Sequence, residues 1–436
     1  MNFYNINNPT EKVSLKEAVL KSVTRVSDLY MPEYIPILSS EFFNRLNCTS
    51  LQKIAFNVSK AMFGQDIPDI ALENIINKAL NFEIPLRQLD KNLYVLELFH
   101  GPTLAFKDVG ARFMAGLFGF FLQNENREIT ILVATSGDTG SAVANAFFNC
   151  NRVKVVLLFP SGRVSHIQEK QLTTMGGNIT ALEVDGDFDD CQHLVKLAFS
   201  DVELNKRLNL TSANSINFAR LFPQSFYYFY SLGQLPAIKK PLVVSVPSGN
   251  FGNLTAGIIA KKMGLHVHNF IASTNINRVI PEYLQNGHFE PHATLHTITN
   301  AMDVGNPSNF PRILELYNNR HNEICDDIKG FWFTDDQTRA SMRELYELYG
   351  YMADPHGAVA YLGLKKFIET NNYTGIFLET AHPAKFPDEV REATGCKVQI
   401  PYGLDNLSDL GKMSVEMPND FDFFRNFLIK SKSQIA

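Results

Sequence analysis

The sequence is poor in cysteine and in long apolar runs, and each scarcity excludes a class of protein. It has five cysteines among 436 residues and no Cys-X-X-Cys pair, so neither a disulfide framework nor a cysteine zinc site is predicted. Reduced, widely spaced thiols are typical of a cytoplasmic protein. No run of about 18 apolar residues occurs, so no membrane span is expected. The N-terminus lacks a basic segment followed by an apolar one, so no signal peptide is predicted.

A charge excess and a metal-binding motif are also missing. The chain has 40 basic and 45 acidic residues, a net charge of −5, so no nucleic-acid-binding surface is predicted. His292 and His296 are four residues apart but lack the adjacent glutamate of an HExxH motif, so no metal site is expected. Two other histidines, His100 and His382, are better candidates for orienting roles in a cleft.

The hydrophobic pattern that is present indicates a mixed α/β protein. Residues 1–95 carry helix-period apolar positions and are expected to form an N-terminal, mainly helical domain. From about residue 93, short apolar runs alternate with amphipathic stretches, which is typical of parallel sheets covered by helices. We expect a large α/β domain from residues 96–125 and 235–436, and a small one from residues 126–234. The predicted helices of the first domain are Leu15–Ser22, Leu51–Phe63 and Ile67–Phe82, with Ser14 and Asp66 as caps. The predicted strands are Leu93–Leu98, Ile129–Ala134, Val153–Phe159, Ile179–Val184, Leu242–Val246, Val267–Ala272 and Gly375–Leu378, and a later helix is predicted over Ile216–Leu232.

One lysine has an unusual sequence context. Lys107 follows an apolar run and the turn Gly101-Pro102 instead of a polar surface stretch. If Lys107 is half-buried at a strand-to-helix junction, burial disfavours its ammonium form and lowers its pKa. A neutral amine is a nucleophile that can form a Schiff base with an aldehyde cofactor. The alternative is an amphipathic helix whose lysine reaches solvent.

Two glycine-rich segments each follow an apolar strand and open a helix. The first, residues 134–142, is Ala-Thr-Ser-Gly-Asp-Thr-Gly-Ser-Ala, and the second, residues 246–255, is Val-Pro-Ser-Gly-Asn-Phe-Gly-Asn-Leu-Thr. Small residues allow close approach of a ligand, and free N–H groups at a helix start bind anions. The second segment is neither a Walker A loop nor a GxGxxG motif, so a phosphorylated ligand smaller than a nucleotide is predicted. The alternative for each is an ordinary glycine turn with a helix cap.

Two further segments carry polar side chains after strands. In residues 211–220, Asn217 and Arg220 lie three apart on one helical face, and together with Ser215 they could bind a second oxyanion. The alternative is a capped helix with a surface arginine. Residues 379–386 follow the last predicted strand, where a hydroxyl could contact a ring nitrogen; the alternative is a polar loop.

Taken in order, these motifs resemble the threonine synthase family, pyridoxal-phosphate (PLP) enzymes of fold type II in the tryptophan synthase beta-like superfamily. The resemblance extends over nearly the whole chain, and it implies two α/β domains around a cofactor cleft. One departure is Val26-Ser27-Asp28, where the family usually has glycine. The segments that carry it are Val13-Ser-Leu-Lys-Glu-Ala-Val19, Leu29-Tyr-Met-Pro-Glu33, His100-Gly-Pro-Thr-Leu-Ala-Phe-Lys107-Asp108, Ser136-Gly-Asp-Thr-Gly140, Ser212-Ala-Asn-Ser-Ile-Asn217, Ser248-Gly-Asn-Phe-Gly252, Asn300-Ala-Met-Asp303 and Thr380-Ala-His-Pro-Ala-Lys-Phe386.

The resemblance implies a role for each motif. Lys107 would be the catalytic residue and would carry PLP as a Schiff base. Thr380 would face the pyridine nitrogen of the cofactor. The residues implied to bind the cofactor phosphate are Gly249, Asn250, Phe251, Gly252 and Asn253. The residues implied to bind the substrate are Ser136, Gly137, Asp138 and Thr139 at its carboxylate, and Asn214, Ser215, Asn217 and Arg220 at its phosphate.

The implied activity is that of a carbon–oxygen lyase acting on phosphates, the last step of threonine biosynthesis. It converts O-phospho-L-homoserine and water into L-threonine and phosphate by β,γ-elimination and replacement. The expected partner is this small molecule, without nucleic acid or membrane, in a cytoplasmic monomer or homodimer. Three alternatives remain: a serine/threonine dehydratase, a phosphohomoserine lyase, and a catalytically silent homologue that binds PLP.

Overall fold

The computed structural model describes residues 1–21, 29–236, 240–369, 372–401, 404 and 410–433. Contacts divide the chain into two compact units, each formed from several segments. Residues 1–95 contribute to both units, and the C-terminal segment joins the first unit. This division into two units does not test the expected three domains, which stay a prediction. The departure at Val26-Ser27-Asp28 lies outside the described residues. The first unit contains residues 1–33, 107–220 and 401–436, and the second contains residues 34–106 and 221–400.

The first unit is built on a five-stranded parallel sheet with strand order β14-β8-β7-β6-β9. The predicted strands at its centre are confirmed, because their apolar side chains are buried on both faces. The two edge strands were not predicted from the sequence. The strands are β6 (Ile129–Ala134), β7 (Val153–Pro160), β8 (Ile179–Asp185), β9 (Leu210–Ser212) and β14 (Ser414–Pro418).

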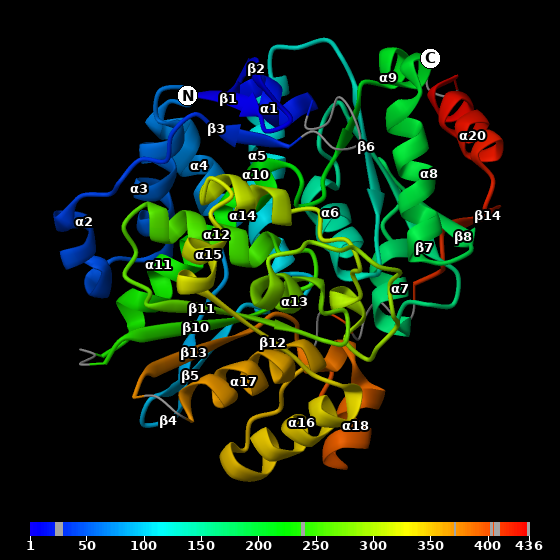
Figure 1. Ribbon diagram of the computed structural model, residues 1–436. Helices are drawn as coiled ribbons and strands as arrows, with labels where there is room; N and C mark the ends of the chain where they lie inside the picture. The colour runs from blue at the N-terminus through cyan, green and yellow to red at the C-terminus, as the bar shows by residue number, and fades with distance from the viewer. Residues whose placement is uncertain (22–28, 237–239, 370–371, 402–403, 405–409, 434–436) are drawn as a thin grey trace. The chain divides into compact units, whose positions relative to one another are not determined.

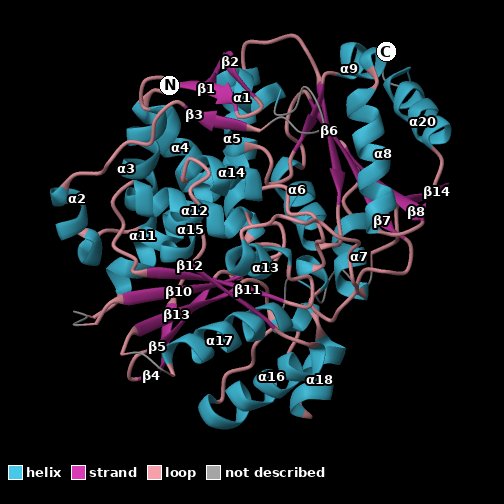
Figure 2. Cartoon of the chain, viewed as in Figure 1, coloured by secondary structure: helices cyan, strands magenta, loops and turns pink. Residues whose placement is uncertain are grey.

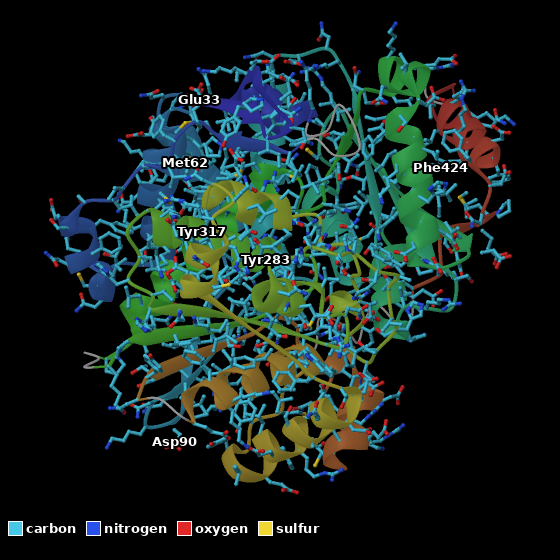
Figure 3. All side chains as sticks on the ribbon, viewed as in Figure 1. Glu33, Met62, Asp90, Tyr283, Tyr317 and Phe424 are labelled. Atoms are coloured by element: carbon cyan, nitrogen blue, oxygen red, sulfur yellow. The ribbon has the colours of Figure 1, made fainter. Side chains whose placement is uncertain are left out.

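Two helices from distant parts of the sequence cover one face of this sheet. Figure 1 shows α8 (Phe188–Ser200) and α20 (Phe421–Ser433) side by side beyond β7 and β8. Phe424 on α20, labelled in Figure 3, is fully buried and belongs to one apolar cluster with residues of α8 and of the strands. The other helices of the unit are α5 (Lys107–Leu122), α6 (Asp138–Phe147), α7 (His166–Thr173) and α9 (Val202–Leu208), and α10 (Phe218–Leu221) ends at the boundary with the second unit.

The N-terminal part of the first unit is a small antiparallel sheet and one helix. The sheet has the order β2-β1-β3 and comprises β1 (Asn2–Asn5), β2 (Asn8–Ser14) and β3 (Tyr30–Pro32). The expectation of mainly helical structure is therefore wrong for residues 2–14 and 30–32, because their backbones pair as antiparallel strands. The predicted cap of α1 (Leu15–Lys21) is confirmed, since Ser14 and Glu17 exchange hydrogen bonds of 3.2 and 3.3 Å in a capping box.

The second unit contains a six-stranded sheet with the order β12-β11-β10-β13-β5-β4, parallel except for the β4–β5 pair. Figure 2 shows α17 (Pro355–Ile368) and α16 (Asp335–Tyr349) on one face, with α13 (Val279–Asn286) on the other. Apolar residues of α16, α17 and the central strands form one buried cluster. The strands are β4 (Leu86–Asp90), β5 (Leu93–Glu97), β10 (Leu242–Pro247), β11 (Asn269–Thr274), β12 (Ile328–Trp332) and β13 (Thr374–Glu379).

Two predicted details of the second unit's helices are wrong. The N-cap residue of α4 is Pro68, so Asp66 does not cap that helix. The helix predicted over Ile216–Leu232 is interrupted, because α10 is followed by a 3-10 turn containing Pro223 before α11 begins. The remaining elements are α2 (Ser40–Asn44), α3 (Leu51–Phe63), α4 (Asp69–Ala79), α11 (Ser225–Gln234), α12 (Gly252–Lys262), α14 (Phe310–Leu316), α15 (His321–Asp327), α18 (Pro387–Thr394) and the 3-10 turns η1 (Leu46–Cys48), η2 (Phe222–Gln224), η3 (Asn300–Met302) and η4 (Pro383–Lys385).

Candidate active site

The motifs singled out in the sequence follow the carboxyl ends of neighbouring strands within each unit. In the first unit, β6 leads into residues 135–139 and the adjacent β9 leads into residues 213–220. In the second unit, the adjacent strands β10, β13 and β5 lead into residues 248–253, Thr380 and residues 98–106. Ligands of open parallel sheets bind at these carboxyl ends. The topology therefore gathers the candidate residues into one group in each unit.

In the first unit, Lys107 faces an aspartate. Its side chain is only 14% exposed, so the interpretation in which this lysine reaches solvent is wrong. Lys107 Nζ lies 3.7 Å from Oδ2 of the buried Asp138, which is the first residue of α6. The carboxylate stabilises a proton on the amine, whereas burial disfavours it. The carboxylate is therefore placed to interact with a proton carried by the amine.

A glutamine that was not predicted from the sequence orients this aspartate. Gln168 on α7 is buried, and its Nε2 donates a 2.9 Å hydrogen bond to Asp138 Oδ1. Its Oε1 accepts from the backbone N–H of Ser165 in a capping box at the start of α7. With Oδ1 held by Gln168, Asp138 presents its other oxygen, Oδ2, to Lys107. The Ser-X-X-Gln spacing could have predicted the cap but not the contact with Asp138.

The backbone of residues 135–140 is fixed by one hydroxyl. Thr135 Oγ1 accepts from the N–H groups of Gly137 and Gly140 at 2.9 and 2.8 Å. Gly137 has φ of +128°, and a Cβ there would lie 2.5 Å from the amide carbon of Gln168. This position therefore requires glycine, both for its conformation and for its space.

The segment after β9 is buried and held by its own backbone. Arg220 is 3% exposed and donates a 2.5 Å hydrogen bond to the carbonyl of Ala213, so the interpretation as a surface arginine is wrong. Burial lowers the pKa of Arg220 to about 10, and the charge of Asp108 opposes this shift. Arg220 therefore stays charged at neutral pH.

The two asparagines of this segment differ in how their amides are used. Asn217 Nδ2 donates to the carbonyls of Val19 and Ser212, and its Oδ1 accepts from Ala219 N. Both ends of this amide hold backbone, which is a structural role. Asn214 Oδ1, in contrast, is buried without a hydrogen-bond partner among the described residues. The amide of Asn214 therefore retains hydrogen-bonding capacity for a ligand, and that of Asn217 does not.

In the second unit, the loop between β10 and α12 has the properties of an anion site. The first N–H groups of a helix have no intrahelical partner, and Gly252 begins α12. Asn253 is 6% exposed, and its Oδ1 accepts from the hydroxyls of Tyr227 and Tyr228 at 2.6 and 2.7 Å. Its Nδ2 is buried without a partner in the described part of the chain. The two tyrosines therefore fix the amide and leave Nδ2, among the described residues, as an unpaired buried donor, which fits a phosphate.

The same loop is packed tightly against a 3-10 turn. A Cβ on Gly249 would lie 2.6 Å from Met302 Cα and 2.9 Å from Ala301 O, both backbone atoms. Phe251 has φ of +59°, a left-handed conformation that is uncommon for a residue with a side chain. The loop therefore has a defined shape, consistent with the sequence prediction of close backbone approach to a ligand.

Thr380 lies where two buried carboxyl groups meet. Its carbonyl accepts from Phe106 N at 2.9 Å, and Phe106 directly precedes Lys107 in the sequence. Asp354 Oδ2 accepts from Ala381 N, and Glu379 Oε1 accepts from Asp354 N. Burial and, after it, the charge of Asp354 raise the pKa of Glu379 well above its usual range.

The histidines proposed for orienting roles have well-defined partners. His100 Nε2 lies 2.8 Å from Glu97 Oε2. His382 Nδ1 accepts from Ala384 N at 3.0 Å, and burial lowers the pKa of His382 to about 4. His382 is therefore neutral near pH 7, and it holds the backbone that follows Thr380.

Comparison with known proteins identifies the family. Residues 2–80 match the family described as threonine synthase N terminus, residues 78–375 match pyridoxal-phosphate dependent enzyme, and residues 357–428 match threonine synthase, C-terminal. The threonine synthase of Haemophilus influenzae is 45% identical over 99% of this chain and 100% of its own length. That of Escherichia coli is 43% identical over 98% of this chain and 99% of its own.

Solved structures agree with the sequence matches. The crystal structure of threonine synthase from Escherichia coli has a TM-score of 0.93 at 43% identity, and the match covers 99% of this chain and 100% of that one. A PLP-bound threonine synthase from Brucella melitensis has a TM-score of 0.92 at 33% identity, with 98% of each chain covered. A plant threonine deaminase, at 15% identity and a TM-score of 0.53, shares only the fold. This chain belongs to the threonine synthase family of pyridoxal-phosphate-dependent enzymes.

Proposed function

We propose that this protein converts O-phospho-L-homoserine and water into L-threonine and phosphate. The observation that carries the proposal is a largely buried lysine beside an oriented carboxylate, in a chain that also has a loop suited to a phosphate. Sequence identity of 45% to a threonine synthase over the whole chain supports the same activity. The reaction requires one anion site for the cofactor and another for the substrate, and the chain offers residues 248–253 and 212–220.

We propose specific roles for the residues that would hold PLP. Lys107 would attach the cofactor covalently, and Gly249, Asn250, Phe251, Gly252 and Asn253 would hold its phosphate through N–H groups. The unpartnered Nδ2 of Asn253 supports this role. Thr380 would contact the pyridine nitrogen. When bound, PLP supplies the electron sink that stabilises negative charge on the substrate carbons.

The protein's own residues supply binding and proton transfer. Ser136, Gly137, Asp138 and Thr139 would hold the substrate carboxylate. Asn214, Ser215 and Arg220 would hold its phosphate, and Asn217, first predicted to contact that phosphate too, would instead fix the backbone of this segment. Lys107 Nζ would remove a proton at Cα and another at Cβ, and it would return one at Cγ after phosphate leaves that carbon. Water then adds its hydroxyl group at Cβ, its remaining proton goes to the departing phosphate, and Lys107 returns the second proton at Cα. Asp138 would stabilise each proton while it resides on the lysine, and the charge of Arg220 suits the departing phosphate.

The proposal is tested by product analysis with a matched lysine control. The purified protein, reconstituted with PLP, is given O-phospho-L-homoserine, and phosphate, threonine and 2-oxobutyrate are measured. We expect threonine and phosphate in equal amounts. Lys107→Ala should remove the cofactor's visible absorption band and lower kcat by about 10²–10⁴-fold or more. Lys91→Ala, at an exposed turn, should leave both unchanged.

Two outcomes would overturn this function. Phosphate accompanied by 2-oxobutyrate in place of threonine would identify a lyase of the same fold. A protein that remains colourless with PLP and shows no lysine adduct would contradict the role of Lys107. We further propose a cytoplasmic enzyme, because all five cysteines are free thiols in the structure.

A further inference from the structure

The residues that lead into α14 form hydrogen bonds with the loop at residues 248–253. Asn250 Oδ1 accepts hydrogen bonds from Ser308 N and Ser308 Oγ at 2.6 and 2.7 Å. The backbone carbonyl of Asn250 accepts from Asn309 Nδ2 at 3.1 Å. Both oxygens of Asn250 therefore accept hydrogen bonds from Ser308 or Asn309. These bonds fix the backbone of Asn250 between Gly249 and the start of α12.

A fully buried arginine orients the asparagine in this support. Arg312 and Asn309 each have 0% exposure, and an Arg312 Nη donates to Asn309 Oδ1 at 2.7 Å. A guanidinium can only donate, and the carbonyl of Asn250 can only accept. Only one orientation of the Asn309 amide satisfies both neighbours. Arg312 therefore determines that Nδ2 of Asn309 faces Asn250.

Arg312 also places a positive charge near the loop. Burial lowers its pKa to about 9, so it remains charged at neutral pH. A charge in the protein interior is screened far less than one in water, so its potential extends over several ångströms. Two hydrogen bonds separate this cation from the loop backbone. A dianionic phosphate bound at the loop would be stabilised by that potential, whereas an uncharged group would not.

We propose that Arg312, acting through Asn309, is a positioning residue that makes the 248–253 loop selective for a phosphorylated ligand. The inference rests on the proposed role of this loop in binding the phosphate of PLP. Arg312 touches neither substrate nor cofactor in this role. It holds the Asn250 peptide in place and supplies charge that the loop itself lacks.

The test compares PLP with pyridoxal, the same aldehyde without phosphate. Apoprotein is titrated with each, and the dissociation constants are measured by absorbance. Because both aldehydes react with the same lysine, the ratio of the two constants isolates the phosphate contribution. Arg312→Gln should weaken PLP by roughly tenfold to hundredfold and change pyridoxal by less than about threefold. Arg312→Lys, which keeps the charge, should recover part of the preference.

Further variants keep the test decisive. Arg320→Gln removes a largely exposed arginine and should change neither ligand. If circular dichroism shows that Arg312→Gln does not fold, Asn309→Asp serves instead, because it gives the guanidinium a carboxylate partner and removes the donor to Asn250. It should reduce the preference for PLP similarly. Equal weakening of PLP and pyridoxal in the folded variant would refute the inference. A wild-type protein without preference for PLP would instead refute the loop's proposed phosphate role.

Discussion

Asn253 combines two hydrogen-bonding roles that substitution can separate. Its Oδ1 accepts from the hydroxyls of Tyr227 and Tyr228, whereas its Nδ2 is the buried donor assigned to the cofactor phosphate. Asn253→Asp keeps an acceptor for both hydroxyls but removes the donor and adds a negative charge. Asn253→Ala removes both functions. Asn253→Asp should therefore be the more stable of the two variants, and Asn253→Ala should be the one that binds PLP more tightly.

The structure sets the expected size of each effect. In Asn253→Ala, Tyr228 keeps the backbone carbonyl of residue 253 as an acceptor at 3.1 Å, so only Tyr227 loses its partner. One buried unsatisfied hydroxyl costs about 1–3 kcal/mol in the free energy of unfolding. Loss of a hydrogen bond to a charged group costs about 1.5–3 kcal/mol, or roughly 10- to 150-fold in the dissociation constant for PLP. Asn253→Asp should bind PLP more weakly still, because its carboxylate repels the phosphate.

Urea unfolding of the apoprotein and absorbance titration with PLP provide the two measurements. We expect Asn253→Asp to be more stable than Asn253→Ala but weaker in binding PLP. Tyr227→Phe is the control, because it removes one donor to Oδ1 and leaves Tyr228 to orient the amide, so affinity should change by less than about threefold. An Asn253→Asp variant that binds PLP as tightly as wild type would refute the role assigned to Nδ2.

Other predictions concern single contacts. Gln168→Glu puts a second carboxylate against Asp138, so the acid limb of the pH–activity profile should move to higher pH. Gln168→Met should lower activity without this shift. Identical pH–activity profiles for the two variants would contradict the contact between residue 168 and Asp138. The pKa of His382 is about 4 when folded and about 6.5 when unfolded, so the unfolded chain binds more protons in this window and stability falls by about 3 kcal/mol as pH decreases from 6.5 to 4. His382→Asn should flatten this dependence in urea titrations, and an unchanged slope would count against it. Gly249→Ala should shift the loop and weaken PLP, whereas Gly119→Ala, whose Cβ meets nothing within 4 Å, should stabilise the helix by about 0.5–1 kcal/mol; equal effects on PLP affinity would contradict the packing.

The central strands and the main motifs could be predicted from the sequence, because their signals are local. Ile129–Ala134 is a continuous apolar run, and the structure has β6 over these same residues. The edge strand β14 reads Ser-Val-Glu-Met-Pro, and most of its side chains are exposed. A strand of this kind is defined by the backbone of its neighbour β8 and not by its own hydrophobicity. The sequence pattern therefore could not indicate it.

The motif residues of the candidate site were predictable, whereas the residues that orient them were not. The glycine-rich segment containing Asn253 is recognisable in the sequence, but Tyr227 lies 26 residues away inside an apolar helix. Gln168 is 30 residues from Asp138 on another element. Such partners are selected by the fold, so only the three-dimensional structure brings them into view.

The place of β14 in the sheet has a consequence for folding during synthesis. This strand pairs with β8, and Phe424 of α20 completes the apolar cluster over α8. Between the end of β8 at Asp185 and the end of β14 at Pro418 the ribosome must add all of residues 186–418. At about 5–20 residues per second, this takes roughly 10–50 s. During that interval one edge of β8 and an apolar face of α8 lack their native cover, so nascent chains of this protein are suited to chaperone binding until translation is nearly complete.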